Sequence, residues 1–229
     1  MLSNRINSLP ASATLAMAAK ARELKNQGID IIGLSLGEPD FNTPEFIKDA
    51  AIKAVEDNYN SYSPVDGYAE LKVAICEKFN RDNYLNYDPS QIVVSTGAKQ
   101  SIANVCMVLL NPGDEVLLPA PYWVSYSAIA TLAEAESTII PSSIDTDFKI
   151  TPEQLEAAIT PKTKLIMFNS PNNPSGTIYS EEEYRALGAV LQKHPDIYIL
   201  SDEIYEHINY GTSHFSIAAI PELYDRTIT

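Results

Sequence analysis

The chain has 229 residues, of which 45% are hydrophobic, and its formal net charge is −14. This length suffices for one large α/β domain, or for one domain and part of another. The excess of acidic residues argues against nucleic acid and anionic membrane surfaces as partners. The first residues do not form a secretory signal and no apolar run is long enough to cross a bilayer, so we expect a cytoplasmic protein.

The cysteines and histidines do not have the spacing of metal ligands. Cys76 and Cys106 each lie within an apolar helical pattern, and His194, His207 and His214 show no pairing typical of a metal site. We therefore expect free thiols in a reducing compartment and no bound metal.

Helical periodicity is the first clear pattern along the chain. Thr43–Glu45 predicts a helix start, with a threonine as capping hydroxyl, a proline at the first helical position and an early acid. Leu71, Ile75 and Phe79 recur at helical spacing and predict a second helix.

Alternating strands and helices follow. Gln91–Ser95 is predicted to be a strand, followed by a tight turn at Gly97, a helix through Leu110 and a turn at Asn111–Asp114. Further strands are predicted at Glu115–Pro119, Ser137–Ile140, Lys164–Phe168, Ile197–Leu200 and from Arg226, with capping boxes at Thr151–Gln154 and Ser180–Glu183. Continuously apolar strands are typical of a parallel sheet covered by helices on both faces. The sequence therefore predicts a three-layer α/β fold.

Polar motifs follow three of the predicted strands. They are Thr96–Lys99, Asn169–Gly176 and Asp202–Tyr205. Ligands of open parallel sheets bind at the carboxyl ends of the strands. The amino end of the helix after Gly97 also offers free backbone N–H groups that suit a phosphate, although an ordinary glycine turn would look the same. We expect these motifs to meet at one edge of the sheet.

Several side chains near this edge have two interpretations. Asp202 is either a helix cap or a carboxylate that keeps a pyridine nitrogen protonated, as pyridoxal phosphate chemistry requires. Tyr205 and Asn173 are either core and turn residues or donors to a cofactor oxygen. Trp123 is either a core aromatic or a ring that stacks on a flat cofactor.

The motifs in this order resemble the class I and II aminotransferases of pyridoxal phosphate fold type I, and most of all the prokaryotic-type aspartate aminotransferases. The resembling stretches cover nearly the whole chain, and several of them are long and specific. They are Ser12–Thr14, Leu36–Phe41, Tyr62–Gly67, Thr96–Gln100, Asn111–Glu115, Pro121–Tyr126, Asn169–Gly176 and Ser201–His207.

The resemblance implies a cofactor site. Asp202 would pair the pyridine nitrogen, Tyr205 and Asn173 would bond the phenolate oxygen, and Trp123 would stack on the ring. The phosphate would lie at Gly97, Ala98 and Lys99, and Tyr62 would reach the phosphate of a neighbouring subunit in a homodimer. Gly37, Trp123 and Asn173 would contact the substrate α-carboxylate. Lys99 with Ser12 and Thr14 would help to select a dicarboxylate, and the peptides before Pro121 and Pro174 would be cis.

The resemblance also implies that the chain is an N-terminal fragment. Residues 1–43 would form an N-terminal arm and part of a small domain, and residues 44–229 an incomplete large cofactor-binding domain. The Schiff-base lysine is expected beyond Thr229, so no catalytic residue is assigned within the chain, which we predict to be inactive and poorly soluble alone.

The predicted activity is transfer of an amino group between aspartate and a 2-oxo acid such as 2-oxoglutarate. Aromatic, alanine or prephenate-type substrates share most of the same motifs. A non-catalytic protein that binds pyridoxal phosphate or a partner is a further alternative. A nucleotide-binding protein that uses the Gly97 turn would leave Asn173, Asp202 and Tyr205 unexplained.

Overall fold

The computed structural model describes residues 2–9, 13–33, 37, 41–208, 210–211 and 213–229, without the side chains of residues 13 and 14. The chain divides into two compact units, Met1–Leu9 with Val65–Thr229, and Pro10–Pro64. The domain boundary predicted at residue 44 stays a prediction. Within the described ranges, no helix is long and apolar enough to cross a membrane.

The unit Pro10–Pro64 contains the helices α2 (Ala13–Asn26) and α3 (Glu45–Glu56). The start of α3 confirms the predicted helix, but the predicted cap is wrong. Pro44 itself is the N-cap, with φ −54° and ψ 143°, and no side chain caps the helix. Thr43 therefore lies one residue too early to act as the N-cap. Glu45 still places a negative charge in the first turn, where the helix dipole favours it.

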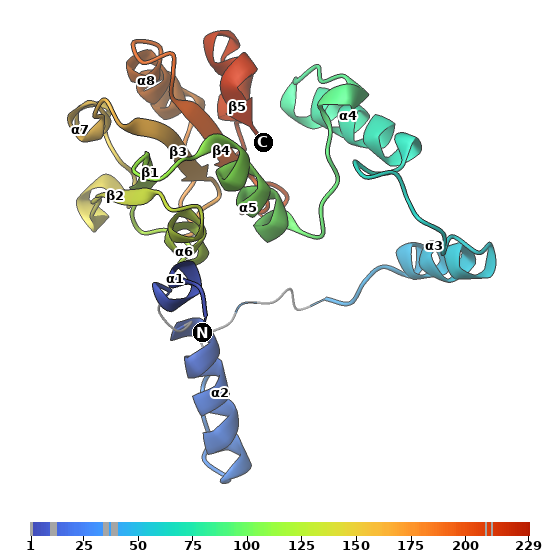
Figure 1. Cartoon of the computed structure of the whole chain (residues 1–229). Coiled ribbons are helices and arrows are strands. Elements are labelled where there is room, and N and C mark those ends of the chain that lie inside the picture. Colours follow the sequence, from blue (N-terminus) through green and yellow to red (C-terminus); the bar gives the residue numbers. More distant parts are fainter. Residues whose placement is uncertain (1, 10–12, 34–36, 38–40, 209, 212) are drawn as a thin grey trace. The chain divides into compact units, whose positions relative to one another are not determined.

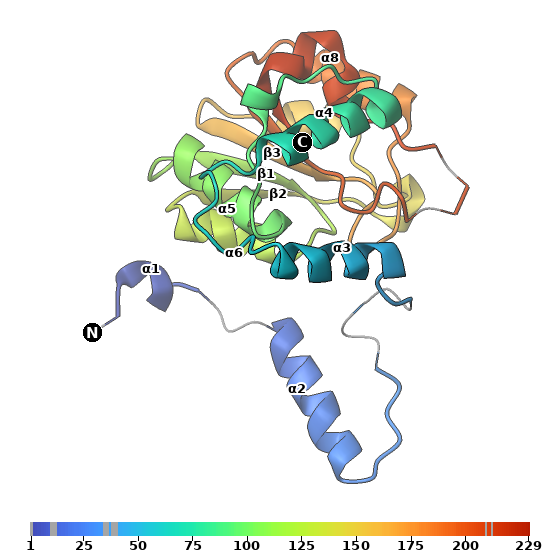
Figure 2. The same ribbon diagram turned by 90° about the vertical axis from the view of Figure 1, so that its right-hand side faces the viewer.

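The larger unit is built on a five-stranded sheet in the order β2-β1-β3-β4-β5, and every neighbouring pair is parallel. Figure 1 shows the strands between α7 and α8 on one face and α5 and α6 on the other, and Figure 2 shows the same layers from the side. The strands are β1 (Glu115–Pro119), β2 (Glu136–Ile140), β3 (Thr163–Asn169), β4 (Tyr198–Asp202) and β5 (Thr227–Ile228). The predicted three-layer parallel fold is confirmed.

The two faces of the sheet have separate apolar cores. Leu117 and Ile166 point into the core beneath α7 and α8, whereas Val116 and Leu165 point into the core beneath α5 and α6. This alternation explains why the strands read as continuous apolar runs, because both faces are covered. The helices of this unit are α1 (Asn4–Asn7), α4 (Ala69–Asn83), α5 (Ala98–Leu109), α6 (Ser125–Leu132), α7 (Pro152–Ala158) and α8 (Glu181–Leu191).

Most of the predicted local signals are confirmed. The capping boxes at Thr151 and Ser180 open α7 and α8, and the turn before β1 closes with a hydrogen bond from the Asp114 amide to the Asn111 carbonyl. The peptides before Pro121 and Pro174 are cis, as the resemblance implied. The peptide between Ser170 and Pro171 is also cis, and that bond was not predicted.

The predicted strand at Gln91–Ser95 is wrong. Gln91 ends a short 3-10 helix that starts at Pro89, and the next four residues pair with no strand of the described sheet. The Val94 amide donates to the carbonyl of Asp66, at 3.0 Å. A β-branched run favours extended backbone, but a strand also needs a partner, which local sequence does not supply.

Arg226 ties the amino side of the sheet to α8. Its Nη1 donates to the carbonyls of His194 and Ile197, at 2.8 and 2.7 Å, and its Nη2 donates to the carbonyl of Leu191, at 2.8 Å. The last carbonyls of a helix lack intrahelical donors, so a charged donor is especially favourable there. Arg226 therefore caps α8 and holds the connection into β4.

We predict that Arg226→Ala lowers the free energy of unfolding by about 2 kcal/mol, because it leaves these carbonyls without their charged donor. Lys193→Ala is the control, since Lys193 is exposed and makes a surface ion pair with Glu156; it should cost about 0.5 kcal/mol. Urea unfolding of both variants checks the difference. Equal losses would show that Arg226 is not a structural anchor.

Candidate functional site

The carboxyl ends of β3 and β4 lie side by side. Asn169 and Asp202 are paired in the parallel register. The Asn169 side chain donates through Nδ2 to the Asp202 carbonyl at 2.9 Å, and the Ser170 amide donates to the same carbonyl at 3.2 Å. These hydrogen bonds connect the loop after β3 to the turn after β4 at the points where both leave the sheet. Two of the three predicted motifs meet at this edge.

Both carboxylate oxygens of Asp202 accept hydrogen bonds. The Ile204 amide donates to Oδ1 at 3.3 Å, which is the cap-like contact expected at the start of a turn. The Tyr126 hydroxyl donates to Oδ2 at 2.7 Å, from the first turn of α6. Asp202 is half-buried, so its carboxylate is oriented by these two contacts while part of it faces a cavity.

Tyr126 stays protonated in this setting. Its side chain is buried, and this burial raises the pKa of the phenol well above its usual range. The neighbouring carboxylate of Asp202 raises the pKa further, because a phenolate beside it would add like charge. Tyr126 therefore acts as a permanent donor toward Asp202.

Asn173 and Tyr205 converge from the two neighbouring segments. The Asn173 amide donates to Asn169 Oδ1 at 2.7 Å, which fixes the loop to the end of β3. The Asn173 side chain donates through Nδ2 to the Tyr205 hydroxyl at 3.4 Å. Two polar groups capable of donating to one oxygen atom thus lie together, close to the Asp202 turn.

Trp123 lies beside the same cluster. Its ring packs edge-on against Tyr126, with centroids 5.6 Å apart, and Lys99 Nζ lies 4.7 Å from the centroid of the indole. A lysine over an indole is held by a cation–π interaction. The amino end of α5 is thereby linked through Trp123 and Tyr126 to Asp202.

Gly97 is the N-cap of α5, with φ +82°. This backbone conformation strains any residue with a Cβ, which accounts for glycine at the position. The first amides of α5, at Ala98 and Lys99, have no acceptor within the helix, so they suit an anion. A cavity of about 210 Å³ is lined by Ala98 and Asp202 together, which brings the third motif to the same edge.

The remaining predicted site residues are not part of this cluster as described. Tyr62 and Gly37 are exposed and belong to the unit Pro10–Pro64, so the structure does not relate them to Asp202. Ser12, the Thr14 side chain and most of the Leu36–Phe41 motif lie outside the described residues.

Two residues of the cluster were not assigned roles from sequence. Tyr126 occupies the first turn of an apolar helix, so its pattern indicates only a core residue. Asn169 looks like the polar end of a strand, and its pairing with Asp202 depends on strand order. The signal that the sequence offered is that Tyr126 and Asn169 lie within the resembling stretches Pro121–Tyr126 and Asn169–Gly176.

One group of potential metal ligands lies next to the cluster. Within the described part of the chain, Glu203, Glu206 and His214 place one ligand atom each within 4.8 Å of one another. Sequence spacing gave no sign of it, because His214 comes from a distant part of the following loop.

Comparison with known proteins identifies the family. Residues 29–227 match the model "Aminotransferase class I and II". The chain belongs to this family. It is 51% identical over 229 residues to the aspartate/prephenate aminotransferase of Nitrosomonas europaea, with 99% of this chain and 58% of that protein covered. It is 50% identical to the aspartate aminotransferase of Bacillus subtilis, with 96% of this chain and 56% of that protein covered.

Solved structures of the family have the same fold. The aspartate aminotransferase of Rhizobium meliloti is 45% identical and superposes with a TM-score of 0.96, covering 99% of this chain and 57% of that one. The Thermus thermophilus enzyme with maleate is 41% identical, with a TM-score of 0.94, covering 99% and 59%. The chain thus spans about three fifths of its relatives' length.

Class I and II aminotransferases depend on pyridoxal phosphate, and the donor set of this chain fits that group. It offers a carboxylate for a ring nitrogen, two donors for a phenolate oxygen, an indole and a helix amino end for a phosphate. The fit comes from the contacts of Asp202, Asn173 and Trp123 described above.

We predict that Tyr126→Phe makes stability less sensitive to alkali. The folded chain keeps the Tyr126 proton, whereas the unfolded chain loses it above the ordinary tyrosine pKa of about 10, so unfolding is favoured as pH rises through that value. The stability difference between wild type and Tyr126→Phe should therefore shrink between about pH 8 and about pH 10.5.

Urea unfolding at the two pH values measures this difference. Tyr210→Phe, at a fully exposed position, is measured in parallel as the matched control. A constant difference for Tyr126→Phe would contradict the assigned protonation.

Proposed function

We propose that the protein carrying this chain is an aminotransferase that moves an amino group between aspartate and a 2-oxo acid such as 2-oxoglutarate. The observation that carries the proposal is the convergence of Asp202, Asn173 and Tyr205 at the paired ends of β3 and β4. The names of the relatives from Bacillus subtilis and Rhizobium meliloti support aspartate as the donor.

Bound pyridoxal phosphate would supply a protonated ring that accepts electrons from the substrate. Asp202 would hold the proton on the ring nitrogen, and Tyr126 keeps that carboxylate oriented. Tyr205 and Asn173 would donate to the phenolate oxygen, and Trp123 would stack on the ring. The amides of Gly97, Ala98 and Lys99 would hold the phosphate, which the positive end of α5 favours.

Substrate binding and assembly are proposed on the resemblance. Gly37, Trp123 and Asn173 would contact the α-carboxylate. Lys99 with Ser12 and Thr14 would favour a second carboxylate on the substrate. Tyr62 would reach the phosphate in a neighbouring copy, so the working form would be a homodimer. We also place the protein in the cytoplasm, which the free thiols of Cys76 and Cys106 fit.

One observation favours prephenate as a second acceptor of the amino group. The Nitrosomonas europaea relative, at 51% identity, is named for prephenate as well as aspartate. Prephenate carries a 2-oxo acid and a second carboxylate, so a site that selects dicarboxylates suits both. Aromatic and alanine-type substrates lack that second carboxylate and are less consistent with Lys99 at the site.

We predict that Asp202→Asn in the native gene product lowers kcat for aspartate by on the order of a hundredfold or more, because the ring nitrogen would lose its charged partner. Asp114→Asn is the control. Asp114 also accepts a backbone hydrogen bond, from Asn111 at 2.7 Å, but it lies at the amino end of β1. Steady-state transamination with 2-oxoglutarate measures the effect.

Equal activity of Asp202→Asn and wild type would refute the assigned role. A wild-type protein that binds no pyridoxal phosphate would instead favour a non-catalytic remnant that binds a partner.

The lysines of the larger unit do not offer a replacement for a cofactor-bearing lysine. Lys162 and Lys164 flank the start of β3, at the edge opposite Asp202. Lys99 is held over Trp123. Four others are ion-paired, namely Lys72, Lys78, Lys149 and Lys193. We propose that the lysine that bears the cofactor in this family lies beyond Thr229.

We therefore predict that the 229-residue chain alone does not transaminate, because no described lysine of the larger unit is placed to carry the cofactor and move the α-proton. The measurement compares its turnover with that of the native gene product under the same conditions. Comparable turnover by the 229 residues would show that one of these lysines, with Lys99 the nearest candidate, does carry the cofactor.

A further inference from the structure

The turn after β4 has two chemically different sides. Asp202 and Tyr205, three residues apart, contact Tyr126 and Asn173. Glu203 and Glu206 are also three residues apart, and they contact other parts of the fold. Residues at this spacing share one side of a helical turn, and the Glu206 amide donates to the Glu203 carbonyl at 2.9 Å, as such a turn requires.

Glu203 is the centre of a buried polar network on the second side. Its side chain is 6% exposed and accepts three hydrogen bonds. Ser201 and Ser216 donate to Oε1, each at 2.7 Å, and His214 lies 2.9 Å from Oε2 through Nε2. Ser201 belongs to β4 and Ser216 caps the next short helix, so one carboxylate joins the strand end to the far end of the loop.

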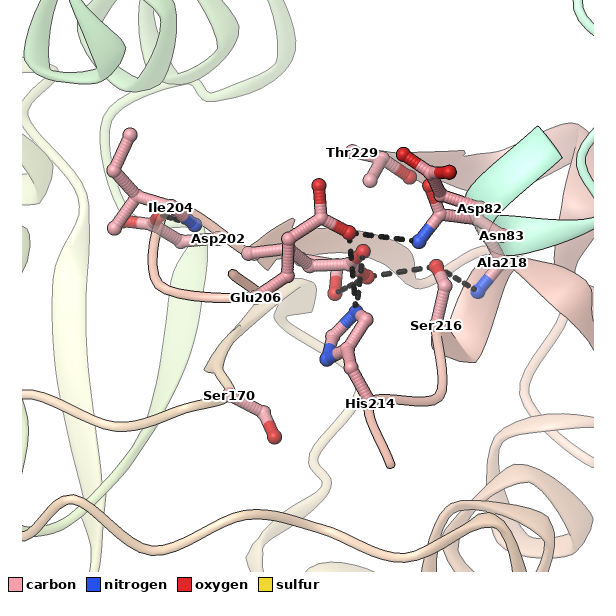
Figure 3. A network of polar contacts seen from close by, with 12 residues as sticks. Asp82, Asn83, Ser170, Asp202, Ile204, Glu206, His214, Ser216, Ala218 and Thr229 are labelled. Atoms are coloured by element: carbon pink, nitrogen blue, oxygen red, sulfur yellow. Dashed lines mark hydrogen bonds and ion pairs between the residues drawn. The ribbon is translucent and has the colours of Figure 1, made fainter. Parts of the chain in front are cut away.

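Glu206 joins the same turn to α4. Lys78 forms an ion pair with its carboxylate, and Asn83 donates to Oε2 at 2.9 Å. Burial alone would raise the pKa of Glu206, but donation from Asn83 and Lys78 outweighs it and lowers that pKa. Figure 3 shows Glu206 between Asn83 and His214, while Asp202 lies apart from them. The turn is thus held on one side by ionised, hydrogen-bonded groups.

The contacts of His214 favour a protein network over a metal centre. Nε2 faces Glu203, and Nδ1 is buried without a hydrogen-bond partner. The carboxylate oxygen of Glu203 can only accept, so Nε2 donates to it, and this hydrogen bond accounts for Nε2 without a metal ion. A metal ion on Nε2 would place the proton on Nδ1, which has no acceptor. Lys78 also already supplies a positive charge beside Glu206.

We propose that Glu203 is a positioning residue for the cofactor site, and that Glu206 reinforces it. This inference rests on the proposed function, because the site it positions is the one assigned to pyridoxal phosphate. Glu203 follows Asp202 directly in the chain, so fixing its carboxylate on the far side of the turn fixes the direction of the Asp202 carboxylate and the place of Tyr205. The cavity beside Asp202 is lined by Glu203 and Glu206 as well, so the anchoring carboxylates form part of its wall.

The test is the affinity of the native gene product for pyridoxal phosphate, measured by equilibrium titration, together with the absorption spectrum of the bound cofactor. Glu203→Ala should weaken binding by about tenfold or more, because the Asp202 turn loses its anchor. Glu203→Gln keeps an oxygen acceptor for Ser201 and Ser216. Its affinity for pyridoxal phosphate should therefore stay within about threefold of wild type, and the bound cofactor should have the wild-type spectrum. Ser201→Ala, which removes a single donor, should lie between them.

Arg226→Ala is the matched control. Like Glu203, Arg226 makes three hydrogen bonds from one charged side chain, but it lies at the amino side of the sheet. It should lower thermal stability without changing cofactor affinity or spectrum. If Glu203→Ala unfolds the protein, the cofactor affinities of Glu203→Gln and Ser201→Ala are compared with that of Arg226→Ala. This comparison still tests the positioning role.

The outcomes separate the two proposals. A wild-type protein that does not bind pyridoxal phosphate overturns the proposed function. A wild-type protein that binds it, with Glu203→Ala and Ser201→Ala binding equally well, overturns the positioning role alone. A cofactor affinity that falls on chelation and returns with zinc would also overturn that role, because the three side chains would then be metal ligands.

Discussion

The register between β3 and β4 is the constraint on which the candidate site depends. Because Asn169 is paired with Asp202, the two chain segments that leave the sheet there begin next to each other. The amide contacts to the Asp202 carbonyl then hold them together. A shift of this pairing by one residue would turn Asp202 to the opposite face of the sheet, away from Tyr126.

The same turn connects the stability of the fold to the chemistry proposed for it. One side carries the polar groups that suit a cofactor, and on the other side the buried carboxylate of Glu203 accepts hydrogen bonds from Ser201, Ser216 and His214. The side of a carboxylate that faces a ligand cannot also contact the protein. Its orientation must therefore be set by other hydrogen bonds and by the backbone that carries it. Tyr126, on α6, orients the Asp202 carboxylate through a direct hydrogen bond. The Glu203 carboxylate orients it indirectly, by fixing the backbone of the turn.

Sequence patterns predicted what depends on local chemistry. The apolar runs of β1 and β3, the capping box at Thr151 and the tight turn at Gly97 were all predictable, because each follows from residues adjacent in the chain. The strand at Gln91–Ser95 was wrong, because a strand needs a partner from elsewhere in the fold. Tyr126 received no role for the same reason, since its partner Asp202 lies 76 residues away.

The most direct test of the account is a crystal structure of the native gene product with pyridoxal phosphate. The account predicts the ring nitrogen against the carboxylate of Asp202, the phenolate oxygen near Asn173 and Tyr205, and the phosphate at the amino end of α5. A cofactor bound at another edge of the sheet, or with its ring nitrogen turned away from Asp202, would contradict the central claim.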